Sequence, residues 1–461
     1  MSGAAEITPS DLERLDRLIG EQERIFVDRQ PGSAAILERA RRSLVGGVTS
    51  NWQITKPRPI WLSHGAGSKV HDVDGREYVD LHGGYGVMAV GHAHPRIVEA
   101  VMARVARGTH FAQPTEDAVI VAEDLKRRFG LPLWRFGNSG TEATMDAVHL
   151  MRAVTGRDLI VKIEGTYHGH HDSVQVSVYQ EPPAIGPAER PNSVPASSGI
   201  PQAMTELTLV VPFNNLDAAE RVFADHPGEI AGMILEPIMM NIGIVEPADG
   251  YLEGLRELTR RHGALLAFDE VKTGLTVAPG GATELMGVTP DIVCLAKAMG
   301  GGLPCGAIGA TEEVMAFVAD GRYEQVGTFN GNPLTMAAAR ATLTEILTDE
   351  AYEHIGELRT TMVEGAGRIL HEYAIPGYVV ARGAKGCVTF HPTRVRDYRD
   401  FLEVDDRFSH CHWLFQHNGG VFLPPWGKAE QWLLSVQHTR EDAERFLANL
   451  RAFAGALRSP R

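Results

Sequence analysis

The stretch ALLAFD at residues 264–269 decides the fold, together with IVCLAK at residues 292–297. Each stretch is a short apolar run that ends in one charged residue, Asp269 in the first and Lys297 in the second. Apolar runs of the same kind, separated by helical patterns, occur at residues 159–163, 207–211 and 230–235. Continuous apolar strands that alternate with helices are typical of a parallel sheet covered on both faces. The sequence therefore predicts an α/β fold with a mostly parallel central sheet.

The alternation of strands and helices divides the chain into three expected parts. Residues 81–335 carry the alternating pattern and form the expected large α/β domain. Residues 1–80 predict a helix and short strands, and residues 336–461 predict a mixture of helices and strands. Both belong to the expected smaller α+β domain. The N-terminal helix is expected to begin at a capping box in Ser10–Glu13.

One long stretch inside the expected large domain interrupts the pattern. Residues 180–203 hold six prolines and no helical or strand periodicity. A loop of this length inside a compact domain is usually functional or disordered. We interpret the stretch as a lid over an active site.

The bulk composition excludes several classes of function. A net charge of −14 over 461 residues argues against nucleic-acid binding, which needs a basic surface. No run approaches the roughly 20 apolar residues that span a bilayer, so no membrane association is expected. The first ten residues lack the apolar core of a signal peptide, and the four cysteines show no paired spacing. We therefore expect a cytoplasmic protein without a disulfide framework.

Charged residues lie at the ends of three apolar runs. Glu236 follows the run at 230–235, and Asp269 and Lys297 end the two stretches quoted above. Ligands of open α/β sheets bind at the carboxyl ends of the strands. An acid that can hold a pyridinium nitrogen and a lysine that can hold an aldehyde are the two groups that pyridoxal phosphate needs. The sequence thus predicts this cofactor, with Lys297 as Schiff base and proton carrier.

Two further motifs complete the expected cofactor site. Ser139, Gly140 and Thr141 precede a helical run, and the N–H groups and hydroxyls of such a turn can hold a phosphate. The same turn could instead be a plain helix cap. Tyr167 and His168 follow the run at 159–163, where an aromatic ring could stack on the cofactor. No metal site is expected in this histidine-rich segment, because its spacing does not place the histidines on one face.

These motifs, in this order, resemble class III aminotransferases. The matching segments are Asn138–Ala143, Tyr167–Gly169, Phe268–Gly274, Lys297 with Gly300–Gly302, and Gly327–Phe329 with Asn332 and Pro333. The resemblance implies the aspartate-aminotransferase fold, known as fold type I of the pyridoxal-phosphate-dependent transferases. It also implies a homodimer with both active sites at the subunit interface. Val271 would pack on the ring face opposite Tyr167, and Thr328 would reach the phosphate of the partner subunit.

Within this class the chain resembles the glutamate-1-semialdehyde aminomutases, but it departs from them where the substrate binds. Gln53 stands where those enzymes have an arginine that binds the substrate carboxylate, and Tyr85 stands where they have a tryptophan. A glutamine cannot pair with a carboxylate in a bidentate way. The segment around Trp426 differs as well. Trp52, Gln53, Tyr85 and Trp426 are therefore expected to line a changed, more apolar substrate pocket.

The expected reaction is a transamination of small molecules. The donor is an amine or a β- or ω-amino acid, and the acceptor is a keto acid or an aldehyde. The alternative is the aminomutase reaction, which forms 5-aminolevulinate, with the carboxylate held by another cation such as Arg382 or Lys428. Racemase and decarboxylase chemistry remain open, because Lys297 would serve them equally. A non-catalytic scaffold is disfavoured, because Lys297 and Asp269 are both present.

Overall fold

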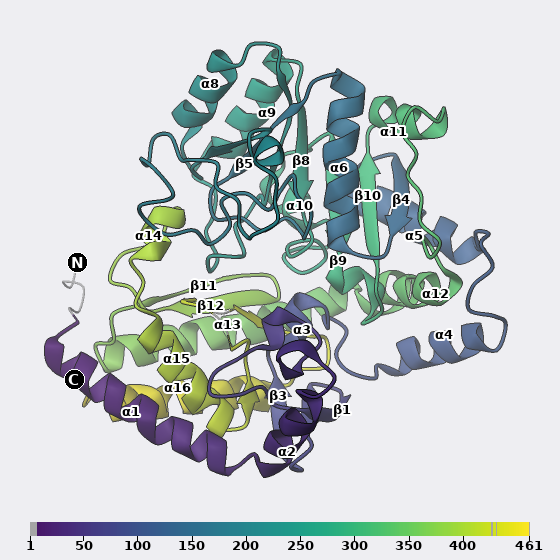
Figure 1. Ribbon diagram of the computed structural model, residues 1–461. Helices are drawn as coiled ribbons and strands as arrows, with labels where there is room; N and C mark the ends of the chain where they lie inside the picture. Colours follow the sequence, from purple (N-terminus) through teal and green to yellow (C-terminus); the bar gives the residue numbers. More distant parts are fainter. Residues whose placement is uncertain (1–6, 426, 430, 461) are drawn as a thin grey trace. The chain divides into compact units, whose positions relative to one another are not determined.

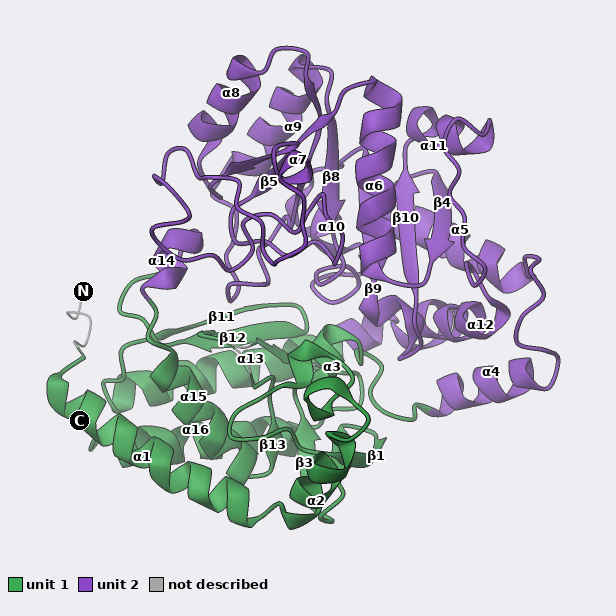
Figure 2. Cartoon of the chain, viewed as in Figure 1, with its two compact units in different colours: residues 1–94, 353–394, 404–461 green, residues 95–352, 395–403 purple. Residues whose placement is uncertain are grey.

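The computed structural model describes residues 7–425, 427–429 and 431–460 (Figure 1). The chain divides into two compact units (Figure 2). The small unit comprises residues 1–94, 353–394 and 404–461, and the large unit comprises residues 95–352 and 395–403. The bounds of these compact units differ from the domain boundaries expected from the sequence, near residues 80 and 335. Those domain boundaries stay a prediction.

A seven-stranded sheet forms the centre of the large unit. Its strand order is β4-β10-β9-β8-β7-β5-β6. The five strands from β9 to β6 are mutually parallel, and β10 runs antiparallel to both β9 and β4. The strands are β4 (Leu133–Gly137), β5 (Leu159–Ile163), β6 (Thr208–Val211), β7 (Ile230–Leu235), β8 (Leu265–Asp269), β9 (Ile292–Ala296) and β10 (Gly306–Ala310). The predicted α/β fold with a mostly parallel sheet is confirmed.

Helices pack on this sheet through small and branched apolar side chains. Helix α6 contacts β7, β9 and β10, while α9 contacts β8 and α8 contacts β6. Ala147, Leu150 and Met151 of α6 are fully buried in one core cluster with Ile160 and Ile234 of the sheet. The helices of this unit are α4 (Pro95–Val105), α5 (Glu116–Phe129), α6 (Gly140–Thr155), α7 (Gln202–Thr205), α8 (Leu216–Asp225), α9 (Tyr251–Arg261), α10 (Gly281–Met286), α11 (Glu312–Ala319), α12 (Pro333–Ala341) and α14 (Tyr398–Leu402).

The small unit holds two separate sheets and its own apolar core. The four-stranded sheet has the order β1-β2-β3-β13, and the three-stranded sheet has the order β11-β12-β14. Phe26, Phe446, Phe453 and Trp432 are among its fully buried side chains. Its strands are β1 (Leu62–Ala66), β2 (Lys69–Asp72), β3 (Glu77–Asp80), β11 (Tyr378–Arg382), β12 (Lys385–Thr389), β13 (Val421–Phe422) and β14 (Gln431–Leu433). Its helices are α1 (Pro9–Asp28), α2 (Pro31–Ala40), α3 (Gly83–Gly86), most of α13 (Asp349–Glu372), α15 (Asp406–Asn418) and α16 (Arg440–Leu457).

The N-cap of the N-terminal helix α1 lies two residues before the expected cap. Thr8 is the N-cap, Pro9 is the first helical residue, and the capping box joins Thr8 with Asp11 rather than Ser10 with Glu13. Asp11 Oδ2 accepts from the backbone N–H of Thr8 at 2.8 Å, and Thr8 Oγ1 accepts from the N–H of Asp11 at 3.2 Å. Proline favours the first helical position, because its missing N–H is not needed there. The expectation for Ser10 was therefore wrong.

The proline-rich segment 180–203 has a defined path held by α14. Tyr398 donates its hydroxyl to Gln180 O at 2.6 Å. Arg399 donates to Ile185 O at 3.1 Å and to Gly186 O at 2.9 Å, and it also pairs with Glu164 at 2.7 Å. A nine-residue segment, 395–403, thus belongs to the large unit although its flanking residues belong to the small one. The lid function of residues 180–203 stays a prediction.

Among the described residues, no helix combines the length and apolar character that crossing a membrane requires.

Candidate active site

Three predicted site residues lie at the carboxyl edge of three adjacent strands. Glu236 follows β7, Asp269 ends β8 and Lys297 follows β9, and these strands are neighbours in the sheet. Glu236 and Asp269 are buried, and Lys297 adopts a positive φ of 46° in the turn that follows its strand. Such a backbone conformation is uncommon outside glycine and is often found at functional sites. The topology thus brings an amine and two carboxyl groups to one edge of the sheet.

The Lys297 amine is adapted for reaction near neutral pH. Loss of hydration, with a further contribution from the Lys272 ammonium, lowers the pKa of Lys297 to about 8. The carboxylates of Asp269 and Glu236 act in the opposite direction without cancelling the shift. Lys272, which the sequence reasoning missed, donates its Nζ to Met240 O at 3.0 Å. A neutral amine is the form that can attack a carbonyl or accept a proton.

Asp269 is held by two hydrogen bonds. Its Oδ1 accepts from the Val271 N–H at 3.0 Å, and its Oδ2 lies 2.8 Å from His168 Nδ1. When Asp269 is ionised it can only accept, so the proton of this second bond lies on His168 Nδ1. His168 Nε2 is buried and has no hydrogen-bond partner among the described residues. The two hydrogen bonds therefore fix the orientation of the Asp269 carboxylate.

The loop between β4 and α6 forms a cradle for an anion. Ser139 is the N-cap of α6, and its Oγ accepts from the Glu142 N–H at 3.2 Å. Thr141 Oγ1 accepts from the His170 N–H at 3.1 Å. A Cβ placed on Gly140 would lie 2.9 Å from both methyl groups of Val271, so only glycine suits this position. The first turn of a helix carries N–H groups without partners inside the helix, and these attract anions.

Tyr167 and Glu236 belong to one network of loops beside this cradle. Burial raises the pKa of Tyr167, and the Asp269 charge raises it further, so the phenol lies near that carboxylate. Glu236 Oε2 accepts from Met240 N–H at 2.7 Å, and its Oε1 accepts from the amide of Asn241 at 2.6 Å. Asn241 also donates to Tyr167 O at 3.4 Å. Both oxygens of Glu236 thus bind the loop that follows β7, and Asn241 is a residue that sequence reasoning missed.

Thr328 lies in the exposed segment that precedes α12. Its neighbours Val326 and Phe329 are 80% and 59% exposed, which is unusual for such side chains. Asn330 in the same segment accepts from the Asn138 amide at 3.0 Å, so the segment is attached beside the β4–α6 loop.

Three of the four residues expected around the substrate lie in the small unit. The Tyr85 hydroxyl donates to Trp52 O at 2.7 Å, and the two rings lie 5.5 Å apart at 57°. Gln53 Oε1 accepts from the N–H of Thr49 at 3.0 Å and from its hydroxyl at 2.7 Å. Trp426 lies outside the described residues.

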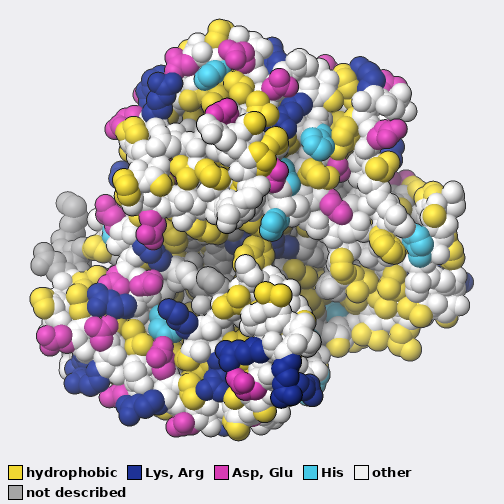
Figure 3. Space-filling model, viewed as in Figure 1, with side chains coloured by type: hydrophobic (Ala, Val, Ile, Leu, Met, Phe, Trp, Pro, Cys, Tyr) yellow, Lys and Arg dark blue, Asp and Glu magenta, His cyan; other side chains and the backbone are white. Residues whose placement is uncertain are grey.

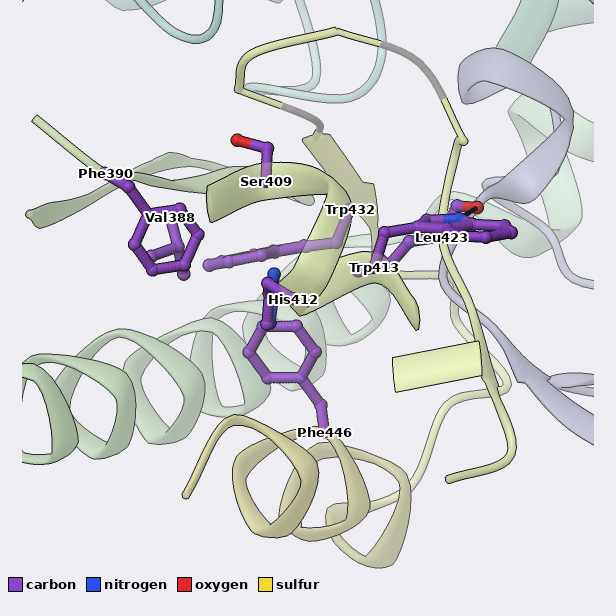
Figure 4. Close-up of a pocket in the computed structure, with 8 residues that line it drawn as sticks. All are labelled: Val388, Phe390, Ser409, His412, Trp413, Leu423, Trp432 and Phe446. Carbon is purple, nitrogen blue, oxygen red and sulfur yellow. Dashed lines mark hydrogen bonds between the residues drawn. The ribbon is translucent and has the colours of Figure 1, made fainter. Parts of the chain in front are cut away.

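The small unit also contains a mostly apolar cavity, and none of the predicted site residues that the structure describes lines it. It has a volume of about 20 Å³ and lies among His412, Trp432, Phe390 and Phe446 (Figure 4). A space of this size holds about one water molecule. It is therefore too small for a substrate. In the described part of the chain, no three histidine, cysteine, aspartate or glutamate side chains are grouped as a metal site requires.

The chain belongs to the class III aminotransferase family, whose model matches residues 53–425. This family and the geometry above make the protein a pyridoxal-phosphate-dependent enzyme of fold type I. It is 39% identical over 422 residues to glutamate-1-semialdehyde 2,1-aminomutase 2 of Brevibacillus brevis, covering 90% of this chain and 96% of the relative.

Two solved structures are similar over nearly the whole chain. An omega-transaminase from Sphaerobacter thermophilus superposes with a TM-score of 0.89 at 35% identity, covering 94% of this chain and 99% of that one. A variant glutamate-1-semialdehyde-aminomutase from Pseudomonas aeruginosa PAO1, in complex with PMP, superposes with a TM-score of 0.88 at 32% identity, covering 97% of this chain and 99% of that one. The chain is thus similar to enzymes of both reaction types.

The residues at the sheet edge fit pyridoxal phosphate in donor chemistry. The N-terminus of α6, with the hydroxyls of Ser139 and Thr141, suits a dianionic phosphate. The Lys297 amine suits the aldehyde, and the fixed carboxylate of Asp269 suits a protonated ring nitrogen. All of these groups lie in the large unit.

Proposed function

We propose that this enzyme is an aminotransferase that moves an amino group from an amine or a β- or ω-amino acid to a keto acid or aldehyde. The observation that carries the proposal is the state of Gln53, which stands where the aminomutases have a carboxylate-binding arginine. Its Oε1 accepts from Thr49, so Gln53 presents an uncharged amide where a charged, bidentate guanidinium would be needed to pair with a carboxylate. The similarity to an omega-transaminase over 94% of the chain supports the same interpretation.

Lys297 carries the proton in this proposal. The bound cofactor supplies an electron sink for the carbon that bears the amino group. Lys297 Nζ would hold the cofactor through its aldehyde and, when its amine is free, would take the proton from the donor carbon. With a pKa of about 8, a sizeable fraction of the amine is neutral at physiological pH. Asp269, directed by His168, holds the proton of the ring nitrogen.

The other predicted site residues hold the cofactor in place. Ser139, Gly140 and Thr141 bind the phosphate, and Tyr167 and Val271 pack on the two faces of the ring. Glu236 orders the loop that contains Asn241, which in turn bonds to the backbone of Tyr167.

We also propose a homodimer in which Thr328 reaches the phosphate of the partner subunit. Exposed apolar side chains support this assembly. Val98, Met102 and Val105 of α4 are 40%, 68% and 52% exposed, and Figure 3 shows hydrophobic atoms gathered over α4. A monomer rarely leaves such a group of large apolar side chains in water. The exposed Phe329 next to Thr328 points to the same conclusion.

Trp52 and Tyr85 are proposed to bind the side chain of the donor. Their rings are in contact, and each is partly exposed: Trp52 is 44% exposed and Tyr85 is half-buried. Together they offer an aromatic surface to a ligand. Trp426 belongs to the same proposal. An aromatic surface next to an uncharged Gln53 favours donors with an apolar or aryl group over donors with a second carboxylate. The cytoplasmic location stays a prediction.

The second candidate is the aminomutase reaction that forms 5-aminolevulinate. The identity of 39% to a glutamate-1-semialdehyde 2,1-aminomutase over 90% of the chain favours it. In that case another cation must hold the substrate carboxylate, and Arg382 and Lys428 are the candidates that the sequence offers.

A half-reaction separates the two candidates. The cofactor-loaded enzyme is mixed, without acceptor, with an aryl-alkyl amine, a β-amino acid or glutamate semialdehyde, and the visible cofactor band is followed. We expect the amine or the β-amino acid to bleach the band, and the Lys297→Ala variant to leave it unchanged on the same time scale. If only glutamate semialdehyde reacts and yields 5-aminolevulinate, the aminotransferase proposal is wrong.

A further inference from the structure

A fully buried lysine lies directly beneath the loop that carries Tyr167 and His168. Lys162 is on β5, an inner strand of the large sheet, and is 0% exposed. Its Nζ donates to Thr166 O at 3.0 Å and to Val176 O at 2.6 Å. Thr166 directly precedes Tyr167, whereas Val176 lies where the same loop returns. One amine therefore joins the beginning and the end of this loop.

Packing alone does not explain why a lysine stands at position 162. Lysine is almost never fully buried unless it is paired, because its charge loses hydration. Burial lowers the pKa of Lys162 to about 7, while Glu236 and Glu164 act to raise it. An apolar side chain of the same length would fill the space without this cost. The two carbonyl oxygens explain why an amine is present, because an apolar side chain cannot donate these bonds.

Other contacts close the same loop around Lys162. The Gly165 N–H donates to Ser177 O at 3.0 Å, and the Thr166 hydroxyl donates to Ile163 O at 2.7 Å. Glu164 is paired with Arg399 through both of its oxygens, at 2.7 and 2.8 Å. These bonds hold the backbone on either side of Tyr167, whereas the Lys162 side chain reaches the loop from inside the sheet.

We propose that Lys162 is a positioning residue, whose bonds to Thr166 O and Val176 O set the placement of Tyr167 and His168 before the cofactor arrives. This inference rests on the cofactor site proposed above, in which Tyr167 packs on the ring and His168 directs Asp269. Lys162 itself touches neither the cofactor nor the substrate. We therefore expect Lys162 to affect how tightly the cofactor binds and how asymmetric the surroundings of the bound cofactor are.

The test compares Lys162→Met with Arg157→Met. Arg157 also donates to two backbone carbonyls in the large unit, Ile230 O at 3.0 Å and His262 O at 2.8 Å, but it lies just before the opposite end of β5. Apoenzyme of each variant is titrated with pyridoxal phosphate, and the visible circular dichroism of the bound cofactor is recorded. Thermal stability is measured in parallel, because both variants lose a pair of bonds to backbone carbonyls.

We expect Lys162→Met to weaken cofactor binding at least about tenfold and to lose most of the visible circular dichroism. Arg157→Met is expected to lower thermal stability while keeping both cofactor properties. If Lys162→Met binds the cofactor with unchanged affinity and unchanged dichroism, the inference is wrong even where stability falls. If the unmodified protein itself fails to bind the cofactor, the proposed function is at fault instead.

Hydrogen exchange decides the question if Lys162→Met does not fold. In the unmodified apoenzyme, the amides of Gly165 and Ser177 are expected to exchange as slowly as in the cofactor-loaded enzyme, because Lys162 orders the loop in advance. Fast exchange of these amides in the apoenzyme alone would show that the cofactor orders the loop, which overturns the inference.

Discussion

The reactivity of Lys297 depends on a neighbouring cation, which makes the Lys272→Met variant informative. Loss of hydration lowers the pKa of Lys297 from its ordinary value of 10.5 to about 8, and the Lys272 ammonium is the first charged group that contributes. Removing that ammonium stabilises the protonated form of Lys297, so the pKa rises. A smaller fraction of the amine is then neutral at a given pH.

The size of the effect follows from the two pKa values. At pH 7.5 about one quarter of an amine with a pKa of 8 is neutral, against about one in a thousand for a pKa of 10.5. The protein environment thus increases the reactive fraction by about 200-fold. A rise of about one pKa unit in Lys272→Met, equivalent to about 1.4 kcal/mol, lowers that fraction about tenfold near pH 7.

The assay follows the attachment of pyridoxal phosphate to apoenzyme by stopped-flow absorbance between pH 6 and 10, values chosen to bracket a pKa of about 8. We expect the rate for the unmodified enzyme to rise with a midpoint around pH 8 before it levels off, and the midpoint for Lys272→Met to lie higher. Lys126→Met removes an exposed lysine of α5 and serves as the control. The cofactor's own titration is common to all three proteins and cancels. A midpoint that is unchanged or lowered in Lys272→Met refutes this account of Lys297.

Three further predictions concern other parts of the molecule. Asp269→Asn removes the charged group that accepts a hydrogen bond from His168. A hydrogen bond to a charged group is worth about 1.5–3 kcal/mol, so we expect kcat for transamination to fall about 10- to 100-fold. Gln53→Arg, but not Gln53→Lys, is expected to gain turnover of glutamate semialdehyde, measured as 5-aminolevulinate; no gain would contradict the assignment of that position. Burial lowers the pKa of His417 to about 3, so its contribution to stability is complete above pH 6.5 and is lost as pH falls towards 3. His417→Gln should therefore reduce the loss of unfolding free energy between pH 7 and pH 5 by about 2 kcal/mol in urea titrations, and an unchanged loss would count against this explanation.

The five parallel strands of the large-unit sheet could be predicted because each of them has a clear local pattern. The runs at 159–163, 230–235, 264–269 and 292–297 are continuous apolar segments between helical patterns, and β5, β7, β8 and β9 lie where these runs predict them. The charged residues at their ends needed no further information, because parallel strands bring their carboxyl ends to one edge.

Contacts between distant segments could not be predicted in the same way. The ion pair between Arg399 and Glu164 joins residues 235 positions apart, and no local sequence pattern at either residue predicts it. Lys162 could not be singled out, because one lysine within an apolar run carries no sign of the carbonyls that it meets. The cap of α1 was misplaced for a smaller reason, since Thr8–Asp11 and Ser10–Glu13 both satisfy the capping-box pattern and only the structure distinguishes them.

The placement of residues 395–403 in the large unit has a consequence for synthesis on the ribosome. Residues 95–352 emerge before α14, which is complete only after the 51 residues from Glu353 to Glu403 have been added. At about 5–20 residues per second this takes about 3–10 s. During that interval the Glu164 carboxylate has no Arg399 to pair with, and the proline-rich segment has no Tyr398 or Arg399 to hold it. The newly synthesised large unit is therefore incomplete until this short helix, whose sequence lies between two segments of the small unit, has been added.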